Sequence, residues 1–298
     1  MDTLLNIKAF LTTARAGSFS AAARQLGVAP SVITKRISRL EDQMDAKLFV
    51  RSTRQLLLTD VGERYLPRYQ AIVGEVEEAL SGASELASSV EGHLRIKAPT
   101  TVTINYLGAI LSDFQVAHPG VSLDVILVDR SVNPVEEGYD VAIGALPVSY
   151  ANVIDEPLCP YPRVLCAAPD YLERHGTPQH PRDLPDHDCL TFHATGSTWS
   201  FESPRGQINV DVRARFSAND TQVLHDIACR GRGIAVVAAY IARPSLKAKR
   251  LVPILPEFPV TELWLKALVP QNKSRKPAMQ ALISHLKQEL QPVPPWDR

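Results

Sequence analysis

The segment from residue 18 to residue 42, SFSAAARQLGVAPSVITKRISRLED, constrains the fold of this chain more than any other. Small residues precede Gly27, and a second helical pattern begins near Pro30. Glycine takes the left-handed conformation that a sharp turn needs, and proline suits a first helical turn, where its missing N–H costs no hydrogen bond. The segment therefore predicts two helices, one at about 20–26 and one from 30 onward, joined by a tight turn.

The second of these helices has an apolar and a polar face. Ile33, Ile37 and Leu40 recur at helical spacing and form a stripe that can pack on the first helix. The opposite face carries hydroxyls and a cation, flanked by two arginines: Ser31, Thr34, Lys35, Ser38, Arg36 and Arg39. Such a helix has the chemistry to enter a DNA major groove, which makes the segment a helix-turn-helix. A solvated helix of a small bundle shows the same pattern and is the alternative.

The N-terminal part of the chain is basic although the whole chain is neutral. Residues 1–68 hold eleven Lys and Arg against six Asp and Glu, so this segment carries a formal charge of +5 and the remainder −5. Between residues 47 and 59, two apolar runs flank a polar tip, which predicts a β-hairpin, or wing, whose Arg51 and Arg54 contact phosphates. An ordinary basic loop is the alternative for the wing. A basic head on an acidic body is typical of a protein whose head meets nucleic acid.

A long apolar seam after the wing predicts a helix that pairs with another helix. Its members alternate at spacings of four and three: Tyr65, Tyr69, Ile72, Val76, Ala79, Ala83, Leu86 and Val90. The alternative is a helix that lies on its own head, but the short head offers little apolar surface for that. We therefore predict a winged helix-turn-helix domain at 1–60 and a linker and dimerisation helix at 61–91.

Short apolar strands alternate with helical stretches from residue 92 onward, which predicts α/β units with largely parallel sheets. We expect lobe I at about 92–161 and 266–290, lobe II at about 162–265, and a flexible tail at 291–298. Ligands of such sheets bind at the C-terminal ends of the strands, where helix N-termini present free N–H groups. The whole chain is thus a multidomain protein of the α+β and α/β classes.

The chain resembles a LysR-type transcriptional regulator. Residues 9–63, AFLTTARAGSFSAAARQLGVAPSVITKRISRLEDQMDAKLFVRSTRQLLLTDVGE, match the winged helix-turn-helix of that family from end to end. Its effector domain is matched more loosely by GHLRIKAPTTV, VSLDVILVDR, EEGYDVAIGAL, RVLCAAPDYLERHGTP, DLPDHDCL and GRGIAVV. The chain departs from the family at Ala29 and Pro30, where a capping Ser or Thr followed by Gln is frequent, so the resemblance does not specify the operator sequence.

The resemblance implies a sequence-specific DNA-binding transcriptional regulator that a small molecule modulates. It also implies a periplasmic-binding-protein-like effector domain, an operator of double-stranded DNA with an interrupted inverted repeat, dimers that form tetramers, and contact with RNA polymerase. Contacts to DNA are expected from seven residues: Ser31, Thr34, Lys35, Arg36, Ser38, Arg51 and Arg54.

The same resemblance places six residues at loop positions that line a cleft between the lobes: Thr100, Thr101, Arg130, Ser131, Thr198 and Asn219. Hydroxyls at a helix N-terminus suit a carboxylate, and Trp199 or Phe201 can cover an apolar or aromatic body, so we expect a small organic or aromatic carboxylate as effector. Helix capping is the commoner role for any single Ser or Thr.

The sequence disfavours membrane and secreted proteins. No apolar run approaches the roughly 20 residues that span a bilayer, and the N-terminus lacks the apolar stretch of a signal peptide. We expect a cytoplasmic protein without membrane contact. The four cysteines show no C-x-x-C pair, which favours buried reduced thiols, with Cys159 and Cys166 as an alternative redox pair. We expect no metal and no cofactor.

Two other functions deserve comparison with transcriptional regulation. An enzyme is disfavoured because the histidines occur without a G-x-S-x-G, H-E-x-x-H, P-loop or G-x-G-x-x-G motif, so we expect no catalytic residues. A chromosome-coating protein without an effector would bind DNA with an affinity set by salt and almost indifferent to sequence.

Overall fold

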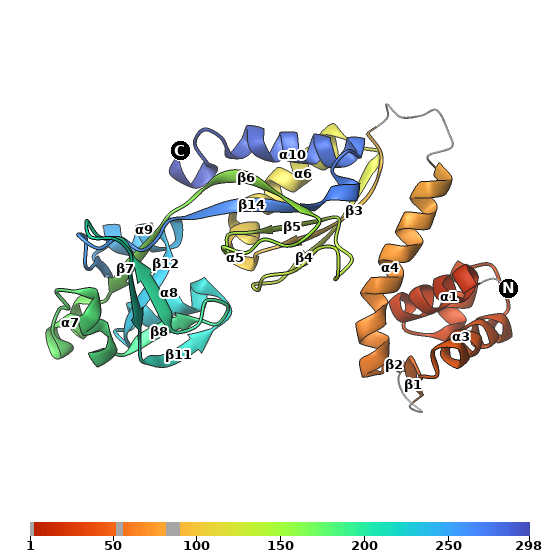
Figure 1. Ribbon diagram of the computed structural model, residues 1–298, viewed down its shortest axis with the longest axis horizontal. Helices are drawn as coiled ribbons and strands as arrows, with labels where there is room; N and C mark the ends of the chain where they lie inside the picture. Colours follow the sequence, from red (N-terminus) through yellow and green to blue (C-terminus); the bar gives the residue numbers. More distant parts are fainter. Residues whose placement is uncertain (1–2, 52–55, 82–89) are drawn as a thin grey trace. The chain divides into compact units, whose positions relative to one another are not determined.

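The computed structural model describes residues 3–51, 56–81 and 90–298 of the chain (Figure 1). The chain divides into two compact units. One unit comprises Met1–Ser89 with Val135–Tyr139, and the other comprises Val90–Pro134 with Asp140–Arg298. The first contains the basic head, and the second contains both predicted lobes except residues 135–139 of lobe I.

The head is a three-helix module followed by a hairpin and a long helix (Figure 1). In chain order its elements are α1 (Thr3–Ala16), α2 (Phe19–Gln25), α3 (Pro30–Met44), β1 (Phe49–Arg51), β2 (Leu56–Leu58) and α4 (Asp60–Ser81). Ser18 caps α2 by accepting a hydrogen bond from the N–H of Ala21 at 3.1 Å. Gly27 has a φ of +63°, and Pro30 is the first residue of α3. The predicted helix-turn-helix is confirmed.

The core of the head forms where the apolar stripe of α3 meets α1. Ile33, Ile37 and Leu40 are buried there together with Phe10 of α1, as the spacing predicts. Glu41 connects this core to the hairpin, because its carboxylate accepts hydrogen bonds from the N–H of Leu48 at 2.9 Å and from Lys47 Nζ at 2.8 Å. The buried carboxylate thereby fixes the direction in which the chain leaves α3.

The described part of the predicted wing is an antiparallel pair, in which Phe49 of β1 lies opposite Leu58 of β2. Its tip at 52–55, including Arg54, lies outside the described residues. Thr59 then caps α4, accepting a hydrogen bond from the N–H of Gly62 at 2.9 Å.

The first half of α4 packs on its own head. Leu66, Tyr69 and Val73 join the head core, and the Tyr69 ring lies 5.9 Å from that of Phe10. The head thus offers more apolar surface than the sequence suggests. Ile72 is 44% exposed, and the seam beyond 81 falls outside the described residues until Val90.

Lobe I is a mixed five-stranded sheet in the order β4-β3-β5-β14-β6. Helices α6 and α10 cover one of its faces (Figure 1). Its elements are β3 (Gly92–Ala98), α5 (Thr100–Val102), the π-helix η1 (Thr103–Leu107), α6 (Gly108–Ala117), β4 (Val121–Leu127), β5 (Val141–Gly144), β6 (Val153–Tyr161), β14 (Leu263–Pro270), η3 (Gln271–Lys273), α10 (Pro277–Leu290) and η4 (Pro295–Asp297).

Lobe II repeats this plan with a sheet in the order β11-β8-β12-β7-β13. Its elements are β7 (Arg163–Ala167), α7 (Pro169–His175), η2 (Pro181–Asp186), β8 (Cys189–Phe192), β9 (Thr198–Phe201), β10 (Ile208–Asp211), β11 (Ala214–Ala218), α8 (Thr221–Cys229), β12 (Ile234–Ala238), α9 (Ala239–Lys247) and β13 (Val252–Pro253). Successive β7 residues face opposite sides of the sheet. Leu165 accordingly packs with Tyr171 of α7, and Cys166 packs with Leu224 of α8.

The prediction of largely parallel sheets is only half right. In lobe I, β3 pairs in parallel with β4 and β5, but β14 is antiparallel to both β5 and β6. The reason is the connection between the lobes: β6 leads the chain out of lobe I and β14 brings it back, so the two run in opposite directions (Figure 1). Lobe II is mixed in the same way, because β7 is antiparallel to β12 and β13.

The predicted flexible tail at 291–298 is wrong. Trp296 is 3% exposed and belongs to the core of lobe I, where its ring lies 5.3 Å from that of Tyr106 and 5.6 Å from that of Tyr240. Arg243 of α9 donates hydrogen bonds to the Trp296 carbonyl and to the Asp297 carboxylate. The segment is rich in proline, yet it packs into the core of lobe I and is hydrogen-bonded to α9 of lobe II.

Candidate functional site

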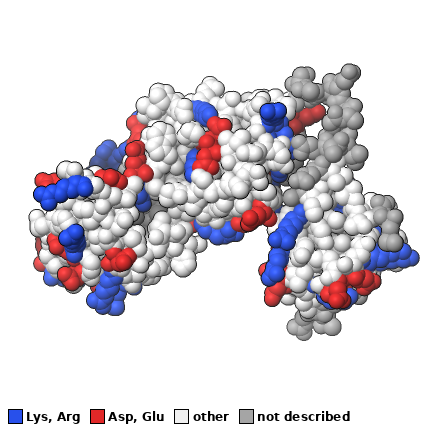
Figure 2. Space-filling model, in the orientation of Figure 1, with Lys and Arg blue, Asp and Glu red and all other residues white. Residues whose placement is uncertain are grey.

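The outer face of α3 presents the polar side chains that its sequence predicts. Ser31 and Lys35 are exposed, whereas Thr34, Arg36 and Ser38 are half-buried. The Thr34 hydroxyl donates to the Pro30 carbonyl at 3.2 Å and keeps its lone pairs available as acceptors. Basic and acidic side chains are interspersed over the head on the face drawn in Figure 2.

The two remaining residues predicted to contact DNA are on the wing. Arg51 ends β1, and nothing is described of its side chain; Arg54 lies outside the described residues.

A cleft of about 580 Å³ separates lobe I from lobe II. It opens at the C-terminal ends of β3 and β5 in lobe I and of β8 in lobe II, as expected for sheets of this kind. Much of its wall is apolar, with Val102 and Val132 on one side and Phe192 and Trp199 on the other. A chamber of this size and lining fits a small organic molecule.

Four of the six predicted effector residues line the cleft: Thr101, Arg130, Ser131 and Thr198. All three of their hydroxyls already have partners: Ser131 Oγ lies 2.7 Å from the Tyr150 hydroxyl, Thr198 donates to Asp211 at 2.6 Å, and Thr101 donates to Asp220 at 2.6 Å. These hydroxyls can still accept a hydrogen bond from a ligand.

Thr100 and Asn219 are not among the lining residues. Thr100 turns to Asp129, to which both its N–H and its hydroxyl donate. Asn219 is exposed, and the cap of α8 comes from Asp220 instead, whose Oδ1 accepts from the N–H groups of Gln222 and Val223. Phe201, predicted to cover the ligand, is fully buried in the lobe II core.

A hydrogen bond crosses the cleft from one lobe to the other. Thr101 Oγ1, in α5 of lobe I, donates to Asp220 Oδ2, at the start of α8 in lobe II, over 2.6 Å. A second polar contact joins the hydroxyls of Tyr161 and Tyr240 at 3.4 Å. Burial raises the pKa of Tyr161 to about 12, so both its charge state and this contact are constant near neutral pH. The helix cap of α8 thus also provides one of the links between the lobes.

Three cations among the residues that line the cleft escape prediction: Lys97, Arg163 and Lys266. Lys97 in β3 is 4% exposed, and its Nζ donates to the Ile143 carbonyl at 3.2 Å. Arg163 is the first residue of β7 and donates to the Thr261 carbonyl at 2.6 Å. For Arg163 a signal was present in the sequence, because it begins an otherwise apolar strand, where a charge is costly without a partner or a ligand. Lys97 gives no such signal, because its strand also holds His93 and Arg95.

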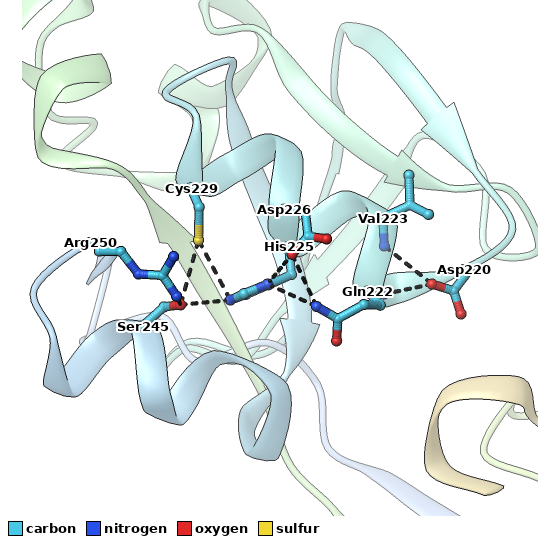
Figure 3. A network of polar contacts seen from close by, with 8 residues as sticks. All are labelled: Asp220, Gln222, Val223, His225, Asp226, Cys229, Ser245 and Arg250. Atoms are coloured by element: carbon cyan, nitrogen blue, oxygen red, sulfur yellow. Dashed lines mark hydrogen bonds and ion pairs between the residues drawn. The ribbon is translucent and has the colours of Figure 1, made fainter. Parts of the chain in front are cut away.

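A polar cluster inside lobe II has the residue types of a hydrolase triad (Figure 3). His225 lies 3.0 Å from Asp226 through Nδ1 and 2.9 Å from the Ser245 hydroxyl through Nε2. Ser245 is 0% exposed, and its oxygen also accepts from Arg250 at 2.8 Å. A substrate cannot reach this oxygen, and none of the four residues lines the cleft, so the cluster joins α8 to α9 and performs no chemistry.

The described residues contain no group of three or more His, Cys, Asp or Glu side chains arranged to hold a metal ion. No helix in the described part of the chain is long and apolar enough to span a bilayer.

A helix-turn-helix head followed by a two-lobed domain with a small-molecule cleft defines a ligand-responsive DNA-binding regulator. Residues 4–63 match the bacterial regulatory helix-turn-helix protein, lysR family, and residues 87–291 match the LysR substrate binding domain. The chain belongs to the LysR family: it is a DNA-binding transcriptional regulator with an effector-binding domain, and not an enzyme.

Known relatives cover nearly the whole chain. The probable HTH-type transcriptional regulator LtrA of Klebsiella pneumoniae is 30% identical over 97% of this chain and 96% of its own length. DmlR of Escherichia coli K12, also an HTH-type transcriptional regulator, is 30% identical over 87% of this chain and 85% of its own.

Two full-length structures share the fold. CrgA, a LysR-type regulator of Neisseria meningitidis, has a TM-score of 0.58 at 25% identity, covering 96% of this chain and 98% of its own. The Vibrio cholerae virulence activator AphB has a TM-score of 0.60 at 22% identity, covering 95% and 98%.

Proposed function

We propose that the effector is a small organic acid with an aliphatic or aromatic body, bound in the cleft between the lobes. The observation that carries this proposal is the cleft itself, with an apolar wall, hydroxyls at its rim, and four basic side chains against two acidic ones, Asp129 and Glu262, among its lining residues. Thr101, Arg130, Ser131 and Thr198 supply the polar contacts in this proposal. Trp199 lies against the body of the ligand.

Effector binding acts on the lobes. The Thr101–Asp220 bond holds them together across the space that a ligand enters. A ligand that binds one spacing of the lobes better than another shifts the balance between them, by no more than its difference in affinity for the two. This shift is the signal that the effector domain sends to the DNA-binding head in this proposal.

DNA recognition is assigned to the outer face of α3 and to the wing. Ser31, Thr34, Lys35 and Ser38 contact bases or adjoining phosphates, while Arg36, Arg51 and Arg54 supply positive charge. The exposure of Ser31 and Lys35, and the anchoring of α3 by its buried apolar stripe, support this assignment. Arginine and hydroxyl side chains contact phosphates in most protein–DNA complexes.

The active form in this proposal is a dimer that pairs through the exposed face of α4, where Ile72 lies, and that assembles into a tetramer. Paired heads require an operator with an interrupted inverted repeat, because the symmetry of the protein is mirrored in the DNA. The functional domains run over 1–60, 61–91 and 92–290. The protein acts in the cytoplasm, beside the chromosome, and contacts RNA polymerase at promoters that it activates.

A footprint on the DNA around its own gene tests this function. The protected region is mapped with the full-length protein, first alone and then with a panel of small acids: benzoate, succinate, malate and glutarate. We expect protection of two half-sites and a change of the protected length or affinity with at least one acid. Protection that stays the same with every acid would reject the effector class.

A further inference from the structure

Arg163 occupies the point where the chain passes between the two lobes. It follows Tyr161, the last residue of β6, by two positions and begins β7 in lobe II. Its guanidinium donates to the carbonyl of Thr261, which lies just before β14, the strand that returns to lobe I. One side chain therefore bridges the outgoing and the returning segments, and it also lines the cleft.

The guanidinium is charged, half-buried and incompletely bonded. Its Nε is buried and has no hydrogen-bond partner among the described residues. No ion pair joins Arg163 to a carboxylate in the described part of the chain, and burial lowers the pKa of this side chain to about 10. A guanidinium has five N–H donors, and a buried charge without a counter-charge is strongly unfavourable.

Another cation of the cleft, Lys266, differs from Arg163 because a carboxylate of the protein balances its charge. Lys266 of β14 lies 2.5 Å from the carboxylate of Asp155 and donates to the Val148 carbonyl over the same distance. Its charge is balanced inside the protein, so it offers little to a ligand. The hydrogen-bond partner of Arg163 is a neutral carbonyl, so its positive charge can still pair with an anion.

We propose that Arg163 is the residue that binds the acid group of the effector. The terminal nitrogens of the guanidinium pair with a carboxylate that enters from the cleft, a geometry in which arginine and carboxylate match well. This assignment rests on the proposed function, since it takes the cleft as the effector site. It adds the anchor residue and places the acid group at the crossing of the lobes, with the body of the ligand toward Phe192 and Trp199.

Anion binding at this position acts on the hinge, that is, on the two segments that connect the lobes. The carboxylate replaces the missing counter-charge at the side chain that joins both connecting segments. A ligand without an acid group can fill the apolar cleft but leaves this charge unbalanced. Acids are therefore distinguished from their neutral amides by the hinge residue. The hydroxyls of Thr101 and Thr198 donate to aspartates and can only accept from a ligand, so they do not make this distinction.

Thermal unfolding of the full-length protein tests the assignment. The probes are benzoate and succinate, with benzamide and succinamide as neutral counterparts, titrated at constant ionic strength. Wild type is compared with Arg163→Gln and Arg163→Lys. The control is Arg174→Gln, because Arg174 also belongs to lobe II and donates to a backbone carbonyl, that of Gly231 at 2.9 Å, but does not line the cleft.

At least one acid is expected to raise the Tm of wild type and of Arg174→Gln with the same apparent Kd, whereas the amides have no effect. In Arg163→Gln the apparent Kd rises at least about tenfold, the size of effect that loss of a charge-assisted hydrogen bond gives. Arg163→Lys falls between the two. Without acid, the Tm of Arg163→Gln equals or exceeds that of wild type, because an unbalanced buried charge is gone.

The results that overturn the assignment separate it from the proposed function. Equal apparent Kd values for an acid in wild type and Arg163→Gln refute the role of Arg163 and leave the acid effector intact. Failure of both acids to stabilise wild type, together with a footprint that none of the four acids changes, refutes both proposals. A fall in the Tm of Arg163→Gln without ligand, alongside an unchanged Kd, shows that the residue is structural only.

Discussion

At the scale of single residues, the inter-lobe hydrogen bond is the contact whose loss is most informative. Thr101→Val keeps the shape of the side chain and removes the donor to Asp220. We predict a loss of about 1.5–3 kcal/mol in the free energy of unfolding, the range for hydrogen bonds to charged groups, measured in urea. Small-angle X-ray scattering should also show wider separation of the lobes.

Thr198→Val is the matched control for this bond. It removes a Thr–Asp hydrogen bond of the same length, 2.6 Å, but within the hairpin of β9 and β10. Scattering of this variant should equal that of wild type. An identical scattering profile for Thr101→Val would show that the bond does not hold the lobes.

Cysteine reactivity is also decided residue by residue. Burial raises the pKa of Cys159, Cys166 and Cys189 to about 12, and the thiolate is the reactive form. Cys229 is half-exposed. At pH 8 iodoacetamide should therefore modify Cys229 first and reach the other three only on unfolding, as read by mass spectrometry. Modification of all four thiols at one rate in the folded protein would contradict the structure.

The alternative of a redox pair between Cys159 and Cys166 finds no support. Cys159 belongs to the core of lobe I, and Cys166 belongs to a core of lobe II that packs against α8 and α9. Closeness in sequence misleads here because the chain passes from one lobe to the other between the two residues.

At the scale of elements, the outer face of α3 is assigned to DNA recognition, whereas its buried face stabilises the head. Thr34→Ala and Lys35→Ala change the outer face and leave the buried stripe of Ile33, Ile37 and Leu40 untouched. We predict that each weakens operator binding by about 1–3 kcal/mol where the side chain reads a base, and that loss of a phosphate contact lowers the salt slope by about 1. The Tm should not change.

Arg15→Ala is the control for Lys35→Ala, because it removes an exposed cation from the last turn of α1. Fluorescence anisotropy with operator DNA measures all three variants at fixed salt. If Arg15→Ala and Lys35→Ala weaken binding equally, the effect is one of overall charge and the assignment of α3 fails.

The cluster that joins α8 to α9 should behave as part of the core. Ser245→Ala leaves His225 and Arg250 without a buried partner. We predict a loss of about 1–3 kcal/mol in unfolding free energy, with operator affinity unchanged while the protein is folded. Ser203→Ala, in an exposed turn, should change stability by less than about 0.5 kcal/mol. Similar losses for the two variants in chemical denaturation would argue against a buried network.

At the scale of the whole molecule, the sequence predicts what is encoded over short distances. The helix-turn-helix follows from the residues around Gly27 and Pro30, and alternation in the strands follows from their local pattern. The packing of the tail at 291–298 could not be predicted from the sequence, because Trp296 contacts Tyr106 and Tyr240, which lie far away along the chain. Prolines indicate where helices and strands end but not whether a segment is packed.

The candidate site divides along the same line. The resemblance to the family places Thr101, Ser131 and Thr198 at the cleft, and all three are among its lining residues. Thr100 lies between the lining residues Pro99 and Thr101, and Asn219 lies two positions before the lining residue Thr221. A shift by one or two positions along the chain therefore decides which side chain enters the cleft. The role of Arg163 could not be predicted, because its buried Nε and its hydrogen bond to the Thr261 carbonyl depend on residues far away in the sequence.

The account depends on one claim: the head reads a specific DNA sequence and the two-lobed domain makes that reading depend on a small acid. The most direct measurement is competition between the operator duplex and a random duplex of equal length, at fixed salt, with and without the acid that alters the footprint. We predict a preference of at least about 10³ for the operator, changed by the acid. Equal affinity for both duplexes, unaffected by any acid, would contradict the account.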